Sequence, residues 1–196
     1  MRLTTDTALL LIDVQRAFHD RRWGKRSTPE AEANIARLLA AWRTTGLPIV
    51  HVRHDSIWPT SPLAPDAPGN AVLPEAAELP GEPVVRKTVN SAFIGTTLEQ
   101  DLRRRGITGV VLVGITTDHC VSTSARMAAN LGFHTWVVAD ATCTFERTGH
   151  DGRYFSAEEM HATALASLHA EFAAVVETTD VVTWVGALHG ELLQSA

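Results

Sequence analysis

The 196-residue sequence predicts an α/β fold: a doubly wound, mostly parallel six-stranded sheet with helices on both faces. Two observations predict this fold. Short runs rich in Val, Ile and Leu are typical of buried parallel strands. These runs alternate with stretches in which apolar residues recur at helical spacing, as the crossover helices of a parallel sheet require. We expect a single domain over residues 1–196, because no shift in composition divides the chain.

The expected elements follow one another along the chain. The first helix, residues 32–46, carries Ile35, Leu38 and Trp42 at helical spacing and ends at Gly46, a suitable C-terminal cap. Residues 96–107 and 120–132 form two further expected helices. The clearest strands are residues 8–14, 48–54, 109–115 and 134–140.

Less regular segments lie between and after these elements. Residues 56–83 hold most of the prolines without a strong period, so we expect a long excursion over one face, of the kind that shapes pockets. Residues 156–174 read as a helix that begins with the capping-box pattern Ser-Ala-Glu-Glu. Residues 173–185 are expected to form a last strand and a turn.

Composition excludes several classes of partner. The formal net charge is -5, and the cluster Arg103–Arg105 looks like the solvated face of a helix end, so nucleic acid is not an expected partner. The apolar run at residues 8–14 is too short to span a bilayer and lacks a signal-peptide pattern, so we expect a cytoplasmic protein without a membrane partner. Its two cysteines, Cys120 and Cys143, are too few for a disulfide framework, which leaves free thiols for chemistry.

Three reactive side chains follow predicted strands. Because ligands bind outside the carboxyl ends of parallel strands, Asp13, Lys87 and Cys120 are candidates for one site. Asp13 could act as general acid or base, and Lys87 could stabilise a thiolate. Taken singly, Asp13 could equally cap a helix, Lys87 could be a solvated lysine, and Cys120 could be a small buried hydrophobe.

The segment around Cys120 is the most informative. A strand is interrupted at Gly114 and followed by a short polar turn, and a helix begins near Cys120. A cysteine in the first turn of a helix lies near the positive end of the helix dipole, which favours the thiolate. The backbone N–H groups of Thr116 and Cys120 are candidates for an oxyanion hole. We treat Cys143 as structural.

Three segments, LLLIDVQRAF, VVRKTVNSAFIGTTLEQDL and VLVGITTDHCVSTSARMAANLGF, resemble the signature regions of the isochorismatase-like cysteine hydrolases, in the same order. The resemblance implies a catalytic triad of Asp13, Lys87 and Cys120. It also implies a cis peptide bond between Ile115 and Thr116. True isochorismatases in this superfamily typically lack the cysteine, so Cys120 favours hydrolysis of a C–N bond.

The resemblance also bears on metals and substrate contacts. Nicotinamidases of this superfamily bind a metal through an Asp-x-His motif, whereas this chain offers only His51, His54 and Asp55. Histidines three apart on a strand point to opposite faces, so we expect no metal and no cofactor. Trp23 and Phe93 lie near strand ends, as other aromatic residues do, and could belong to the pocket wall or to the core. The weaker candidates for substrate contact are Gln15, Phe18, His54, Trp58, Asn90 and Phe145.

These observations predict a cofactor-independent hydrolase of a small amide, carbamoyl compound or lactam, acting through a thioester acyl-enzyme. One alternative is vinyl-ether hydrolysis of isochorismate type, with Asp13 as the acid. Another is a non-catalytic binding or redox-sensing module with an oxidisable thiol. The resemblance implies a dimer or tetramer, and an apolar face around Trp184 and Leu188 could contribute to the interface.

Overall fold

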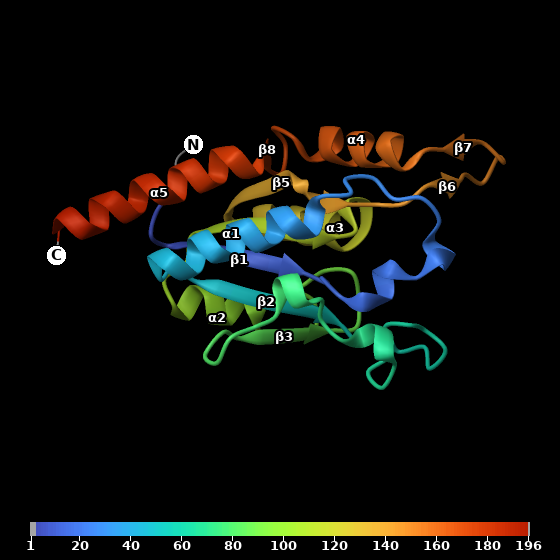
Figure 1. The fold of residues 1–196 in the computed structure, drawn as a ribbon, viewed down its shortest axis with the longest axis horizontal. Helices are drawn as coiled ribbons and strands as arrows, with labels where there is room; N and C mark the ends of the chain where they lie inside the picture. The colour runs from blue at the N-terminus through green and yellow to red at the C-terminus, as the bar shows by residue number, and fades with distance from the viewer. Residues whose placement is uncertain (1–2, 196) are drawn as a thin grey trace.

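The protein, described over residues 3–195 of a computed structural model, is built around one six-stranded sheet (Figure 1). Every neighbouring pair of strands is parallel, and the order is β3-β2-β1-β4-β5-β8. The predicted fold class is confirmed. The strands are β1 (Thr7–Ile12), β2 (Ile49–His54), β3 (Val84–Lys87), β4 (Gly109–Ile115), β5 (His134–Cys143) and β8 (Ala174–Val176).

Helices cover both faces of the sheet. In β1, Leu9 and Leu11 pack toward α1 and α5, whereas Leu10 and Ile12 pack toward α2 and α3, so the two-residue period of the strand divides the core into two layers. The helices are α1 (Ala31–Thr45), α2 (Leu98–Arg104), α3 (Ser122–Asn130), α4 (Ala157–Leu168) and α5 (Thr178–Ser195).

The predicted helix ends have clear local causes. Gly46 ends α1 in the left-handed conformation, with φ of 66°. At α4, the Ser156 hydroxyl accepts from the Glu159 N–H, and the Glu159 carboxylate accepts from the Ser156 N–H. Both sequence signals therefore marked real helix boundaries.

The expectation for residues 173–185 is partly wrong. Strand β8 ends at Val176, and α5 begins at Thr178 where a turn was expected. Val181 and Val185 are buried one helical turn apart, with Trp184 and Leu188 packed at the edge of the same core. Packing on α1 outweighs the strand preference of the β-branched residues, and the apolar face proposed as an interface contributes to the protein's own core.

Two further segments belong neither to the six-stranded sheet nor to the helices that cover it. Residues 56–83 form the expected excursion, with short 3₁₀ turns at Pro68–Asn70 and Pro74–Ala76. A small antiparallel hairpin, β6 (Arg147–Thr148) with β7 (Tyr154–Phe155), was not expected from the sequence. No helix within residues 3–195 is long and apolar enough to cross a membrane.

The carboxyl ends of β1 and β4 are unusually close. Gly114 pairs with Ile12 at φ of 124°, and a Cβ atom there would lie 1.9 Å from the Ile12 carbonyl oxygen. Only glycine fits at this position. The close approach brings Asp13, which follows β1, beside the turn that leaves β4.

Candidate active site

Asp13 and Lys87 form a buried ion pair. Lys87 Nζ donates to Asp13 Oδ2 at 2.6 Å, and both side chains are fully inaccessible to solvent. Asp13 adopts a φ of 50°, a left-handed conformation that Asp tolerates better than most residues. The two side chains thus meet at the carboxyl edge of the sheet, across β2, as the predicted location of both residues requires.

Cys120 lies on a wide helical turn, Thr117–Val121, between β4 and α3. The peptide bond before this turn, between Ile115 and Thr116, is cis. The Thr116 carbonyl accepts hydrogen bonds from the N–H groups of His119 at 3.1 Å and Val121 at 3.2 Å, which flank Cys120 in the chain. The turn holds Cys120 at the same sheet edge as Asp13 and Lys87.

The electrostatics of Cys120 differ from the sequence expectation. Burial and, to a smaller extent, the Asp13 carboxylate raise the pKa of the Cys120 thiol to about 12, although Lys87 opposes this rise. The expected preference for the thiolate is therefore outweighed by desolvation. With such a pKa the resting form is a thiol, which would have to lose its proton to act as a nucleophile.

Asp13 has one oxygen available to receive that proton. Its Oδ2 is held by Lys87, whereas its buried Oδ1 has no hydrogen-bond partner within residues 3–195. One Asp13 oxygen, Cys120 Sγ and a His54 ring nitrogen lie within 4.8 Å of one another. Burial raises the pKa of Asp13, although Lys87 opposes this effect, so the carboxylate is a stronger base than an exposed aspartate.

Three of these groups could in principle ligate a metal, but their surroundings do not favour one. Asp13, His54 and Cys120 supply donor atoms, yet the Lys87 ammonium already bonds Asp13 and lies 3.1 Å from His54 Nδ1. A positive side chain within the cluster opposes a second cation. His51 points away and pairs with Glu82 at 2.8 Å, so the two histidines do not converge.

The polar candidates for substrate contact lie in different settings. Gln15 is fully buried, and its amide bonds to the backbone of His54 and Asn70, so no part of it is left for a substrate. Trp58 is 70% exposed in the excursion after β2. Asn90 is exposed in the loop after β3.

The aromatic candidates separate into two groups. Phe18, Trp23 and Phe145 stack on one another with ring centroids 5.4–6.3 Å apart, and both phenylalanines are nearly buried. They support the Ile115 side of the turn as part of a small core cluster. Phe93 instead stacks on Phe133 at 6.0 Å and packs into the core beneath α2 and α3.

Asp118, which the sequence offers as a cap of the helix after Cys120, makes no such cap and instead forms two long-range contacts. Its carboxylate accepts from the Thr144 hydroxyl at 2.5 Å and pairs with Arg147 at 2.9 Å. These contacts fasten the turn that carries Cys120 to the chain after β5. No spacing rule could have found them, because their partners follow a bulged strand whose course depends on the folded sheet.

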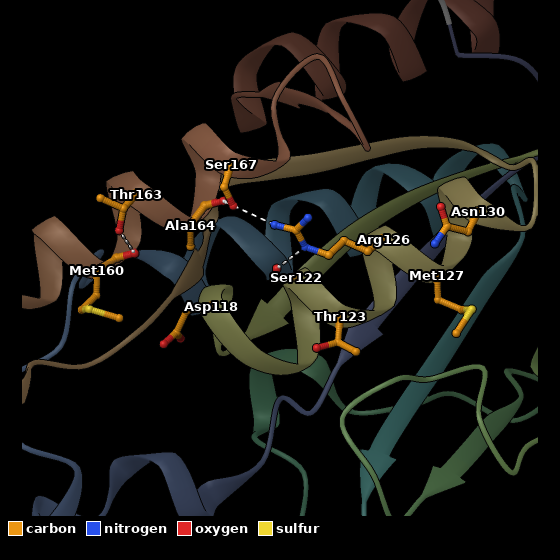
Figure 2. Close-up of a pocket in the computed structure, with 10 residues that line it drawn as sticks. All are labelled: Asp118, Ser122, Thr123, Arg126, Met127, Asn130, Met160, Thr163, Ala164 and Ser167. Carbon is orange, nitrogen blue, oxygen red and sulfur yellow. Dashed lines mark hydrogen bonds between the residues drawn. The ribbon is translucent and has the colours of Figure 1, made fainter. Parts of the chain in front are cut away.

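A groove of about 580 Å³ lies between α3 and α4 (Figure 2). Arg126 reaches across it from α3 and donates to the Ser167 hydroxyl on α4 at 2.8 Å. None of Asp13, Lys87 and Cys120 lines this groove. The reactive cluster is therefore a separate location, at the carboxyl edge of the sheet.

Comparisons with known proteins agree on one family. A family model described as an isochorismatase domain matches residues 7–180. The chain is 42% identical over 175 residues to the isochorismatase family protein YrdC of Bacillus subtilis, covering 89% of this chain and 94% of that protein. It is 45% identical to a crystal structure of an isochorismatase-family hydrolase from Chromobacterium violaceum, with a TM-score of 0.92 and coverage of 95% and 97%. N-carbamoylsarcosine amidase from Thermoplasma acidophilum is 26% identical, with a TM-score of 0.70 and coverage of 88% and 96%.

Proposed function

Since the chain belongs to the isochorismatase family of hydrolases, we propose that it cleaves the C–N bond of a small amide, carbamoyl compound or lactam, with Cys120 as the nucleophile. The observation that carries this proposal is that the two carboxylate oxygens of Asp13 differ in their hydrogen bonding. Lys87 holds Oδ2, Oδ1 has no hydrogen-bond partner among residues 3–195, and one of the two Asp13 oxygens lies within 4.8 Å of Cys120 Sγ. The similarity to an amidase supports the choice of a C–N bond.

The first half of the reaction forms a thioester. Asp13 Oδ1 takes the Cys120 proton while Sγ attacks the substrate carbonyl carbon. The N–H groups of Thr116 and Cys120 donate to the negative oxygen of the tetrahedral intermediate. As the intermediate collapses, the C–N bond breaks, and the protonated Asp13 gives its proton to the leaving nitrogen.

The second half uses water. Asp13 takes a proton from a water molecule as the water oxygen attacks the thioester carbon. The C–S bond then breaks, the acid product leaves, and the proton on Asp13 returns to Cys120. The Lys87 ammonium, bonded to Asp13, balances the negative charge, which moves between the Asp13 carboxylate and the oxygen of the tetrahedral intermediate.

Substrate identity would be tested by mass spectrometry of a panel of small amides, carbamoyl compounds and lactams. The panel is incubated with wild-type protein, with Cys120→Ser, and with Cys143→Ser as the matched control at the other free cysteine. We expect a product from wild type and from Cys143→Ser, and at least a ~100-fold slower reaction from Cys120→Ser.

The same panel, extended with vinyl ethers of isochorismate type, distinguishes the alternatives. Isochorismate-type substrates that are hydrolysed equally well by wild type and Cys120→Ser would indicate vinyl-ether chemistry with Asp13 as the acid. A protein that turns over none of these compounds, but whose Cys120 is oxidised by low concentrations of peroxide, would instead be a thiol sensor. Either result would overturn the proposed C–N hydrolysis.

A further inference from the structure

Lys87 crosses one strand to reach Asp13. It ends β3, Asp13 follows β1, and β2 lies between these two strands. Neighbouring strands are about 4.8 Å apart, so the lysine side chain must extend over β2 before its ammonium meets the carboxylate. His54, the last residue of β2, pairs in register with Lys87. The imidazole therefore lies beside the path of the lysine side chain.

All three donors of the Lys87 ammonium are used. They reach Asp13 Oδ2 at 2.6 Å, His54 Nδ1 at 3.1 Å and the Val89 carbonyl at 3.1 Å. An ammonium group can only donate, so Nδ1 of His54 must be the acceptor and the ring proton is on Nε2. A doubly protonated imidazole would present N–H to N–H and lose this contact.

The backbone of His54 is itself fixed. Its N–H donates to Gln15 Oε1 at 2.9 Å, and its carbonyl accepts from Gln15 Nε2 at 3.1 Å and from Asn70 Nδ2 at 3.0 Å. Gln15 is fully buried and Asn70 is 5% exposed. Two buried amides are thus committed to the strand end that carries this imidazole. Such an arrangement limits where the ring can point.

We propose that His54 is a positioning residue: its neutral imidazole holds the Lys87 ammonium on Asp13 Oδ2, which leaves Asp13 Oδ1 free to accept the Cys120 proton. The contact between His54 and Lys87 follows from the structure alone. Its effect on turnover rests on the proposed cysteine hydrolysis. The titratable and charged groups facing the ring are Lys87, Asp13, Cys120 and Asp55. Burial and the nearby lysine lower the pKa of His54 to about 4, which keeps the ring neutral at ordinary pH.

Three substitutions separate this role from substrate binding. In His54→Asn, the amide oxygen can occupy the position of Nδ1 and accept from Lys87. In His54→Gln, the longer amide mimics Nε2 instead, and His54→Leu removes both functions while keeping an apolar group of similar reach. A positioning role predicts that Asn is the best replacement and that the loss of activity in the other two variants appears as a lower kcat. A substrate contact through Nε2–H predicts that Gln is the best replacement and that KM rises.

A substrate-free readout keeps this test independent of the proposed reaction. The rate of alkylation of Cys120 by iodoacetamide is followed against pH by peptide mass spectrometry. We expect the alkylation rate of His54→Asn to stay within about threefold of the wild-type rate. In His54→Leu the Lys87 ammonium is no longer held in place, so the pKa of the Cys120 thiol rises. A rise of one unit reduces the thiolate tenfold, so we expect alkylation at pH 8 to be about tenfold slower.

Wild-type alkylation in His54→Leu, or rescue by Gln but not by Asn, would overturn the positioning role. If His54→Leu does not fold, the comparison of Asn with Gln still decides. An intact alkylation pattern in a protein that hydrolyses no amide would count against the proposed function alone.

Discussion

The Asp13–Lys87 pair explains how a thiol with a high pKa can become a nucleophile. Cys120 is not a thiolate at rest, since burial raises its pKa to about 12. Burial also raises the pKa of Asp13, which makes the carboxylate a better match for the thiol proton. Lys87 limits this rise, so Asp13 stays able to accept a proton. In the proposed mechanism, activation of the thiol therefore depends on three side chains acting together.

This coupling predicts a specific pattern of stability. Lys87→Met leaves the buried Asp13 carboxylate without a counter-charge, and we expect the free energy of unfolding to fall by about 3–5 kcal/mol. The double variant Asp13→Asn, Lys87→Met removes both charges and should regain part of this loss. Urea denaturation of the three proteins measures the difference. A double variant less stable than Lys87→Met would contradict an account based on the unpaired charge.

Residues of the site differed in how predictable they were. Asp13, Lys87 and Cys120 follow apolar strands, and parallel strands end at a common edge, so their meeting could be predicted from the sequence. The contact from Lys87 to the Val89 carbonyl could not, because any residue supplies a carbonyl. Gln15 was considered for substrate binding, but its neighbours in the fold are backbone groups that its amide must satisfy.

Among the elements, the excursion after β2 is fastened at its far end by Glu82. Arg43 on α1 donates twice to the Glu82 carboxylate at 2.8 Å, and the buried His51 lies 2.8 Å from it. The hydrogen bond from Arg43 is the largest cause that lowers the pKa of Glu82 to about 2. The excursion is therefore attached by charge to the helix and strand that it follows.

This attachment predicts an acid-sensitive segment. The pKa of Glu82 is lower in the folded state than its ordinary value of 4.5, so its contribution to stability is present above pH 4.5 and is lost as the pH falls toward 2. We expect Glu82→Gln to flatten the fall in unfolding free energy over this range. Glu75→Gln, at an exposed position of the same excursion, is the matched control. Equal pH profiles for the two variants would rule out the proposed attachment.

The elements also show where pattern reading was insufficient. Gly46 and Ser156 marked helix ends correctly, because capping is a local interaction. The first turns of α5, rich in Val and Thr, were expected to belong to a strand and a turn. The helical form of these residues depends on packing against α1, a tertiary contact that a local period does not report.

At the scale of the whole molecule, we expect a homodimer or homotetramer. Helix α5 packs along the body at its start, and its C-terminal turns extend past the sheet (Figure 1). Leu193 on this extension is 68% exposed. A second copy covering such a surface would remove apolar area from water. Sedimentation equilibrium should therefore give two or four times the chain mass of 21.2 kDa, and a monomer at micromolar concentration would contradict the expectation.

The central claim is that Cys120 carries the acyl group during turnover. The most direct measurement is to quench the protein with acid during hydrolysis of an amide found in the panel, and to map added mass by peptide mass spectrometry. The account predicts an acyl adduct on the peptide containing Cys120 in wild type and in Cys143→Ser, and its absence in Cys120→Ser. Sustained turnover by Cys120→Ser at the wild-type rate, with no adduct on any protein, would contradict it.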